Sequence, residues 1–217
     1  MSPLAKLCCL AIGYLFGNLL AAELAARIFA HKSVFEVGDG NPGMANVGAH
    51  LGVPAAAVTL GGDVVKTILA FVVARALFPT NAAEAGCLAT MAVTLGHNHP
   101  FWHHFQGGKG VTTTVSAIIL SAPAAGIVAS LLGMAATLVL GYLCVGAIAI
   151  TLAYSLITWL FGLWVPFAWV SLPLLACMVM KHGWAVTGIR EGWTKRASVS
   201  DEFWKRVGKA GGNRERG

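Results

Sequence analysis

The chain has 217 residues, of which 57% are apolar and only 11% are charged, and its mean hydropathy is +0.72. An ordinary soluble domain has about 25% charged residues, so this composition excludes one. The formal net charge is +6 at pH 7. We therefore predict an all-α polytopic membrane protein, with an integral membrane domain over residues 1–182 and a basic cytoplasmic tail over residues 183–217.

Apolar runs separated by Gly, Pro and polar clusters predict about seven membrane helices, some shorter than the ~20 residues of a perpendicular span. We expect these helices near residues 5–29, 52–78, 82–97, 110–121, 123–141, 143–162 and 166–182. The fourth helix should end early, because Pro123 lacks a backbone donor and restricts the residue before it.

Positive charge is concentrated near the C-terminus. Nine of the fifteen Lys and Arg residues lie between Lys181 and Gly217, and the positive-inside rule therefore places the C-terminus in the cytoplasm. With an odd number of crossings, the N-terminus is outside, and the loops near residues 30–51 and 97–110 both face the cytoplasm. The two loops should then meet on one side of the membrane.

Both loops are polar and rich in glycine. The first reads Gly-Asp-Gly-Asn-Pro-Gly-Met-Ala-Asn over residues 38–46, and the second contains Gly-His-Asn-His-Pro over 96–100 and Gly-Gly-Lys-Gly-Val-Thr-Thr over 107–113. Backbone amides near a helix start bind phosphate, glycine lets the backbone approach closely, and Lys109 adds a positive charge. The pattern predicts an anion site. It lacks the glycine spacing and the preceding strand of a nucleotide-binding P-loop, so we do not expect nucleotide hydrolysis.

These motifs resemble those of the bacterial acyl-phosphate:glycerol-3-phosphate acyltransferases of the PlsY type. That family has a first loop Gly-Ser-Gly-Asn-x-Gly-x-Thr-Asn, a second loop Gly-His-x-Phe-Pro followed by Gly-Gly-Lys-Gly-Val-Ala-Thr, and a third motif His-Arg-x-Asn-Ile. Here the third motif corresponds to residues 182–186, which read His-Gly-Trp-Ala-Val. The likeness spans nearly the whole chain in order, spacing and membrane context.

The resemblance implies transfer of a fatty acyl group from an acyl phosphate to glycerol 3-phosphate, giving lysophosphatidic acid for phospholipid biosynthesis. It implies a multi-pass protein of the cell (inner) membrane whose active site faces the cytoplasm. We expect no metal and no cofactor. An acyl phosphate already has a good leaving group, so the protein need not form a covalent intermediate. The catalytic residues that we expect are Lys109, His182 and, acting as a base, Asp39. The substrate-binding residues that we expect are Gly38, Gly40, Asn41, Gly43, Asn46, His50, His97, Gly107, Gly108 and Gly110.

Some positions differ from the family pattern and motivate alternatives. Asp39 replaces a serine, Ala49 and Gly188 each replace an arginine, and Ala185 replaces an asparagine. Losing a phosphate-pairing arginine removes a bidentate clamp. One alternative is therefore a weakened or repurposed homologue that binds a phosphorylated lipid or metabolite. Another is a transporter, motivated by intramembrane Asp63 and Lys66.

Two further groups have competing interpretations. Asp63 and Lys66 share one helical face, so they are either a structural pair or part of the active site. His97, His99, His103 and His104 are either a metal cluster or, with Trp102, interfacial anchors. We favour anchors for His103 and His104, and no metal. The basic tail follows a membrane helix directly, which indicates contact with anionic membrane lipids rather than with nucleic acid.

Overall fold

The computed structural model describes residues 1–162 and 164–197, without the side chains of residues 164–169. Within these residues the chain forms helices and turns and no strand, which confirms the all-α prediction. The α-helices are α1 Pro3–Gly17, α2 Ala21–Ala30, α3 Met44–Leu51, α4 Val53–Leu77, α5 Ala82–Asn98, α6 Val111–Ser121, α7 Pro123–Leu140, α8 Leu143–Leu160 and α9 Trp164–Glu191. Single 3-10 turns lie at η1 Val34–Glu36, η2 Pro79–Asn81 and η3 Phe101–His103.

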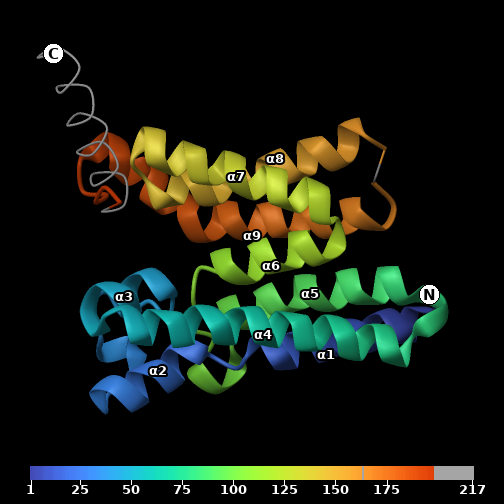
Figure 1. Ribbon diagram of the computed structural model, residues 1–217, viewed down its shortest axis with the longest axis horizontal. Helices are drawn as coiled ribbons and strands as arrows, with labels where there is room; N and C mark the ends of the chain where they lie inside the picture. The colour runs from blue at the N-terminus through green and yellow to red at the C-terminus, as the bar shows by residue number, and fades with distance from the viewer. Residues whose placement is uncertain (163, 198–217) are drawn as a thin grey trace, which may run out of the picture.

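The helices form two layers with α6 between them (Figure 1). One layer holds α1, α4 and α5, with α2 and α3 at one end, and the other holds α7, α8 and α9. Among the described residues, five segments are long and apolar enough to cross a membrane: Pro3–Ala30, Val53–Leu77, Pro123–Leu140, Leu143–Leu160 and Val170–Glu191. Helices α5 and α6 have 17 and 11 residues, so the expected total of about seven crossings stays a prediction.

The first predicted helix, residues 5–29, is divided into α1 and α2. Helix α1 ends at Gly17; the side-chain amide of Asn18 donates to Tyr14 O at 2.5 Å, and Leu20 is extended (φ −84°, ψ 99°). The backbone carbonyls of Gly17 and Leu19 are instead hydrogen-bonded by the Lys66 ammonium of α4. A continuous apolar run does not reveal this break, because the group that satisfies the free carbonyls comes from another helix.

The region between α2 and α4 contains a short helix that the sequence analysis left as loop. Helix α3 begins after extended Gly43, and Gly52, with φ +85°, ends it. Pro54 then occupies the first turn of α4, where its missing donor is harmless. A similar proline start confirms the expected break at Pro123, since α6 ends at Ser121 and α7 begins two residues later.

The last helix, predicted to end at residue 182, continues to Glu191. It ends where the backbone amides of Trp193 and Thr194 donate to the Gly188 carbonyl at 3.1 and 3.2 Å, next to Gly192 with φ +84°. The predicted boundary between membrane domain and tail therefore falls inside α9. Most of the predicted tail, residues 198–217, lies outside the described residues.

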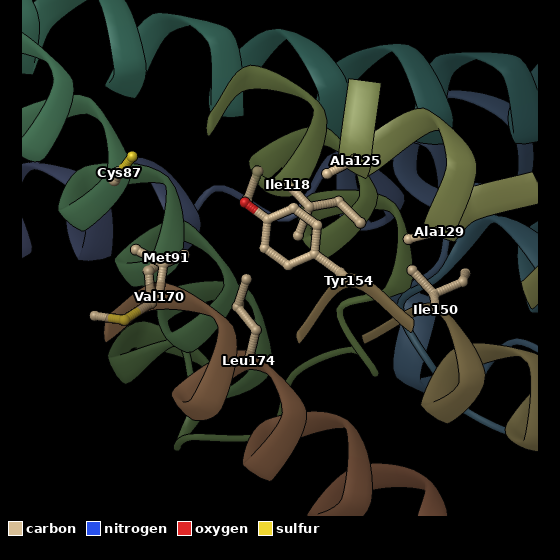
Figure 2. Close-up of a cluster of buried hydrophobic side chains, with 10 residues drawn as sticks. Cys87, Met91, Ile118, Ala125, Ala129, Ile150, Tyr154, Val170 and Leu174 are labelled. Carbon is tan, nitrogen blue, oxygen red and sulfur yellow. The ribbon is translucent and has the colours of Figure 1, made fainter. Parts of the chain in front are cut away.

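The largest apolar cluster joins the two layers through α6 (Figure 2). The Tyr154 ring of α8 lies at its centre, with Ile118 of α6 on one side and Leu174 of α9 on the other. All three side chains are at most 1% exposed. The cluster holds α5 and α6 against α9, and so it fixes the loop between α5 and α6 relative to the second layer.

Candidate functional site

Asn46, in the first turn of α3, closes the first glycine-rich loop. Its side-chain oxygen accepts the Asp39 backbone N–H at 3.2 Å. Its side-chain nitrogen donates to Val37 O at 2.8 Å and to Asn41 O at 3.0 Å. With every polar atom of a buried amide engaged, the loop is held in one shape before any ligand arrives.

Glycine is required at two points of this loop. Gly38 and Gly40 have φ values of +59° and +72°, in the left-handed region. A Cβ on Gly38 would also overlap the His50 ring, whose Nδ1 lies 2.9 Å from Asn46 O. The Asp39 carboxylate is exposed and accepts the Asn41 backbone N–H at 3.0 Å, so it stabilises the turn. Its expected role as a base stays a prediction.

Three glycines of the second loop pack against the end of α5. A Cβ on Gly107 would overlap the His97 carbonyl, and one on Gly110, which has φ +74°, would overlap the Asn98 side chain. The Gly108 backbone N–H donates to His97 O at 3.0 Å. Larger residues would lift residues 107–110 away from α5, so close packing explains the glycine content.

The two loops meet at Gly108, as expected. A Cβ on Gly108 would overlap the His97 imidazole at Nε2 and would lie 3.0 Å from the Pro42 carbonyl, one residue from Gly43. Residues about 65 positions apart in the chain are therefore in contact at the inner ends of both loops. The face of the membrane to which this junction belongs stays a prediction.

Lys109 and His182 are brought to the same region. Lys109 is exposed on the loop immediately before α6, whereas His182 of α9 is 4% exposed. The two groups lie within electrostatic range of each other. His182 Nε2 has no hydrogen-bond partner among the described residues. A buried nitrogen of this kind is suited to an incoming polar ligand.

Lys181 attaches α9 to the end of α5. Its ammonium donates to Asn98 O at 2.8 Å, which places a second positive charge beside the junction. The adjacent His99 side chain is half-buried, and burial, helped by the charge of Lys181, holds its pKa below the ordinary histidine value. Lys181 and Lys109 thus bring two positive charges beside the junction, which favours anions there.

Sequence reasoning missed Asn98 as a site residue. It is fully buried beside Gly110, and both polar atoms of its amide lack a hydrogen-bond partner within the described chain. Its position between two histidines of the second loop was the available signal. Sequence reasoning also missed that His97 contacts Lys66, because 31 residues separate them.

Two departures from the family pattern have distinct surroundings. Ala49 lies on the exposed side of α3 and lines an apolar groove of about 410 Å³, which Leu143 of α8 and Ala197 also line. Gly188 is covered by the Trp193 ring, so an arginine does not fit there without moving that ring. No positive charge stands at either position.

The chain was compared with known proteins. The sequence profile of the family described as glycerol-3-phosphate acyltransferase matches residues 7–192. The chain is similar to glycerol-3-phosphate acyltransferase 1 of Lactobacillus johnsonii, with 36% identity over 92% of this chain and 96% of that protein. It is also similar to the glycerol-3-phosphate acyltransferase of Alkaliphilus metalliredigens, with 30% identity over 84% of this chain and 91% of that protein.

Solved structures give the same fold. The crystal structure of PlsY, described as an integral membrane glycerol 3-phosphate acyltransferase in its glycerol 3-phosphate form, superposes with a TM-score of 0.79. The match covers 91% of this chain and 98% of that one at 22% identity. The lysophosphatidic acid form of PlsY gives a TM-score of 0.78. The comparisons agree with the apolar helices in indicating a multi-pass membrane protein.

Proposed function

Because this chain belongs to the glycerol-3-phosphate acyltransferase family, we propose that it transfers a fatty acyl group from an acyl phosphate to the 1-hydroxyl of glycerol 3-phosphate. The products are lysophosphatidic acid and inorganic phosphate. The observation that carries the proposal is the junction at Gly108, which joins both glycine-rich loops and places Lys109 near His182. Two phosphate-bearing substrates require two adjacent anion sites, and two adjacent loops can supply them.

In the proposed reaction, the substrate hydroxyl oxygen attacks the acyl carbonyl carbon, and the bond from that carbon to the phosphate oxygen breaks. The hydroxyl proton passes to the departing phosphate or to His182. The protein has to orient two anions and to stabilise the developing oxyanion. The free amides at the start of α6 and the Lys109 ammonium bind the phosphate of one substrate. The loop closed by Asn46, with Asn41 and the amides of Gly38 to Gly43, binds the other.

We further propose that the protein lies in the cell (inner) membrane with this junction facing the cytoplasm, and that the basic tail contacts anionic lipid. The concentration of Lys and Arg after residue 181 supports this orientation. The loop between α5 and α6 lies nearer to the end of the bundle that holds α3 than to the N-terminus (Figure 1). Substrates that are soluble phosphates then reach it from the compartment in which they are made.

The test is phosphate release by purified protein in detergent, given an acyl phosphate and glycerol 3-phosphate. We expect Lys109→Ala to lower kcat/KM by about a hundredfold or more, because it removes a charge that stabilises a developing anion, and His182→Ala to lower it as well. Lys6→Ala is the control, since Lys6 pairs with Glu84 at the other end of the bundle. Unchanged activity in both Lys109→Ala and His182→Ala would contradict this assignment of the site.

A second candidate is a family member that binds the phosphorylated ligand without turning it over. It is favoured by Ala49, which presents a methyl group to an apolar groove instead of a charge to the loops. Glycerol 3-phosphate binding by calorimetry without phosphate release in the same preparation would favour this candidate. Under it, Ala49→Arg is expected to raise the rate of phosphate release from a very low baseline.

A further inference from the structure

Asp63 and Lys66 form a buried ion pair within α4. Lys66 Nζ lies 2.7 Å from Asp63 Oδ1, and their side chains are 5% and 3% exposed. Ionised groups inside a membrane helix are unfavourable unless they are paired, and they mark functional positions more often than structural ones. We propose that this pair is a positioning device that fixes the tautomer of His97, so that its Nε2–H points at the junction of the two glycine-rich loops.

The hydrogen bonds of Lys66 define the tautomer. An ammonium group has three N–H donors and cannot accept. Lys66 Nζ donates to the carbonyls of Leu19 at 2.9 Å and Gly17 at 3.3 Å, where the chain breaks between α1 and α2. It also lies 3.0 Å from His97 Nδ1 and 2.7 Å from Asp63 Oδ1, so four groups surround its three N–H donors. Because the ammonium cannot accept, a 3.0 Å contact with it fits only an unprotonated Nδ1, and in a neutral imidazole the proton then lies on Nε2.

The alternative tautomer, with the proton on His97 Nδ1, also has a nearby acceptor. Asp63 Oδ1 lies 3.5 Å from His97 Nδ1, and a proton on Nδ1 would point at that carboxylate. Lys66 is closer to both groups than they are to each other. While the ammonium occupies this position, it neutralises Asp63 and donates to the imidazole, which excludes the Nδ1–H tautomer.

The other edge of the His97 ring lies at the junction. Nε2 is adjacent to Gly108, near the Pro42 carbonyl and one residue from Lys109. A neutral N–H donor here is directed at the place where both loops meet and binds a phosphate oxygen without adding charge to a buried site. The phosphate ligand follows from the proposed function, whereas the tautomer depends only on the contacts of Lys66.

The tautomer is measured directly by NMR on protein labelled with 15N-histidine in detergent. The chain has seven histidines, and loss of one set of signals in His97→Gln assigns His97. We expect a protonated Nε2 and an unprotonated Nδ1. Adding inorganic phosphate, or glycerol 3-phosphate without an acyl donor, should shift the Nε2 signal. A proton on Nδ1, a doubly protonated ring, or no shift with either ligand would overturn the proposal.

The role of the ion pair is tested by the double variant Asp63→Asn, Lys66→Met, which leaves no buried charge unpaired. We expect the His97 signals to show a mixture of tautomers or the Nδ1–H form. Thr67→Val is the matched control, because it removes a buried hydrogen bond from Thr67 to Asp63 O on the same helix without touching His97. Unchanged His97 signals in the double variant would show that Lys66 does not set the tautomer.

The kinetics of two substitutions at His97 test this inference separately from the proposed function. Glutamine can place an N–H near the position of Nε2, whereas asparagine is too short. We expect His97→Asn to raise KM for glycerol 3-phosphate or the acyl phosphate, lowering kcat/KM about ten- to a hundredfold, and His97→Gln to lose less than tenfold. Equal losses would contradict the positioning role. If wild-type protein shows the expected tautomer and shift but releases no phosphate, acyl transfer fails while this inference stands.

Discussion

Gly108 is the residue on which the geometry of the junction depends most directly. A methyl group there meets the His97 ring at the end of α5 and the Pro42 carbonyl of the first glycine-rich loop. We expect Gly108→Ala to destabilise the protein by about 1–3 kcal/mol through overpacking and to reduce phosphate release severely. The measurements are the thermal unfolding midpoint in detergent and the phosphate-release rate.

Gly183→Ala is the matched control for that prediction. A Cβ on Gly183 meets no atom within 4 Å, and the residue lies inside α9. Alanine in a helix interior is more favourable than glycine by about 0.5–1 kcal/mol, so the unfolding midpoint should stay or rise. If both substitutions have the same effect on unfolding, steric contact at Gly108 is not the cause.

The half-buried His99 predicts a pH dependence of stability. Burial and the Lys181 charge lower its pKa in the folded protein, so the unfolded chain, with a histidine pKa of about 6.5, binds the proton more readily. The contribution of His99 is therefore fully present above about pH 6.5 and is lost as the pH falls towards the folded pKa. We expect His99→Gln to reduce the fall in unfolding midpoint between about pH 7 and pH 5. Parallel curves for the two proteins would contradict this.

At the scale of helices, α7 and α8 approach each other closely at Gly133 and Gly146. A Cβ on Gly146 would overlap the Thr137 side chain and lie 2.7 Å from the Gly133 carbonyl. Small residues allow such contacts between membrane helices, where apolar burial gives no net drive for association. We expect Gly146→Ala to destabilise by about 1–3 kcal/mol. Gly61→Ala in α4, where nothing lies within 4 Å, should be neutral or stabilising.

Most helices could be predicted because membrane helices are coded by local apolar runs. The observed α6 and α7 differ from the predicted ranges by one residue at one end, and α4 differs by one residue at each end. The break after Gly17 could not be predicted, since Lys66 satisfies its carbonyls from another helix. Helix α3 was missed because its ends are set by Gly43 and Gly52, which also indicate a loop.

The site was predictable to the extent that it consists of contiguous motifs. The two loops were recognisable from their glycines and Lys109, and the structure places them together. The contacts that organise the loops come from single side chains at a distance. No sequence motif marks Asn98 as a site residue. The contact between Lys66 and His97 depends on how α4 packs against α5. Such pairings require the tertiary structure.

For the whole molecule, the arrangement of helices and the distribution of charge predict that the two ends of the bundle lie on opposite sides of the membrane. The N-terminal amine lies 3.2 Å from Glu84 Oε2, so the N-terminus shares one end with the turn at Pro79–Asn81. The loop between α5 and α6 is separated from that turn by the length of α5 (Figure 1). The excess of Lys and Arg near the C-terminus predicts that the loop faces the cytoplasm.

Cysteine labelling tests this orientation in intact cells. With the five native cysteines replaced by alanine, Thr80→Cys and His104→Cys each introduce one thiol at an exposed position. A charged, membrane-impermeant maleimide should label Thr80→Cys in intact cells and His104→Cys only after the membrane is opened. Labelling of both from outside would place the two turns on one face, which a 17-residue α5 that crosses the bilayer does not allow. Labelling of His104→Cys alone in intact cells would show that the bundle has the opposite orientation. The glycine-rich loops would then face away from cytoplasmic phosphates.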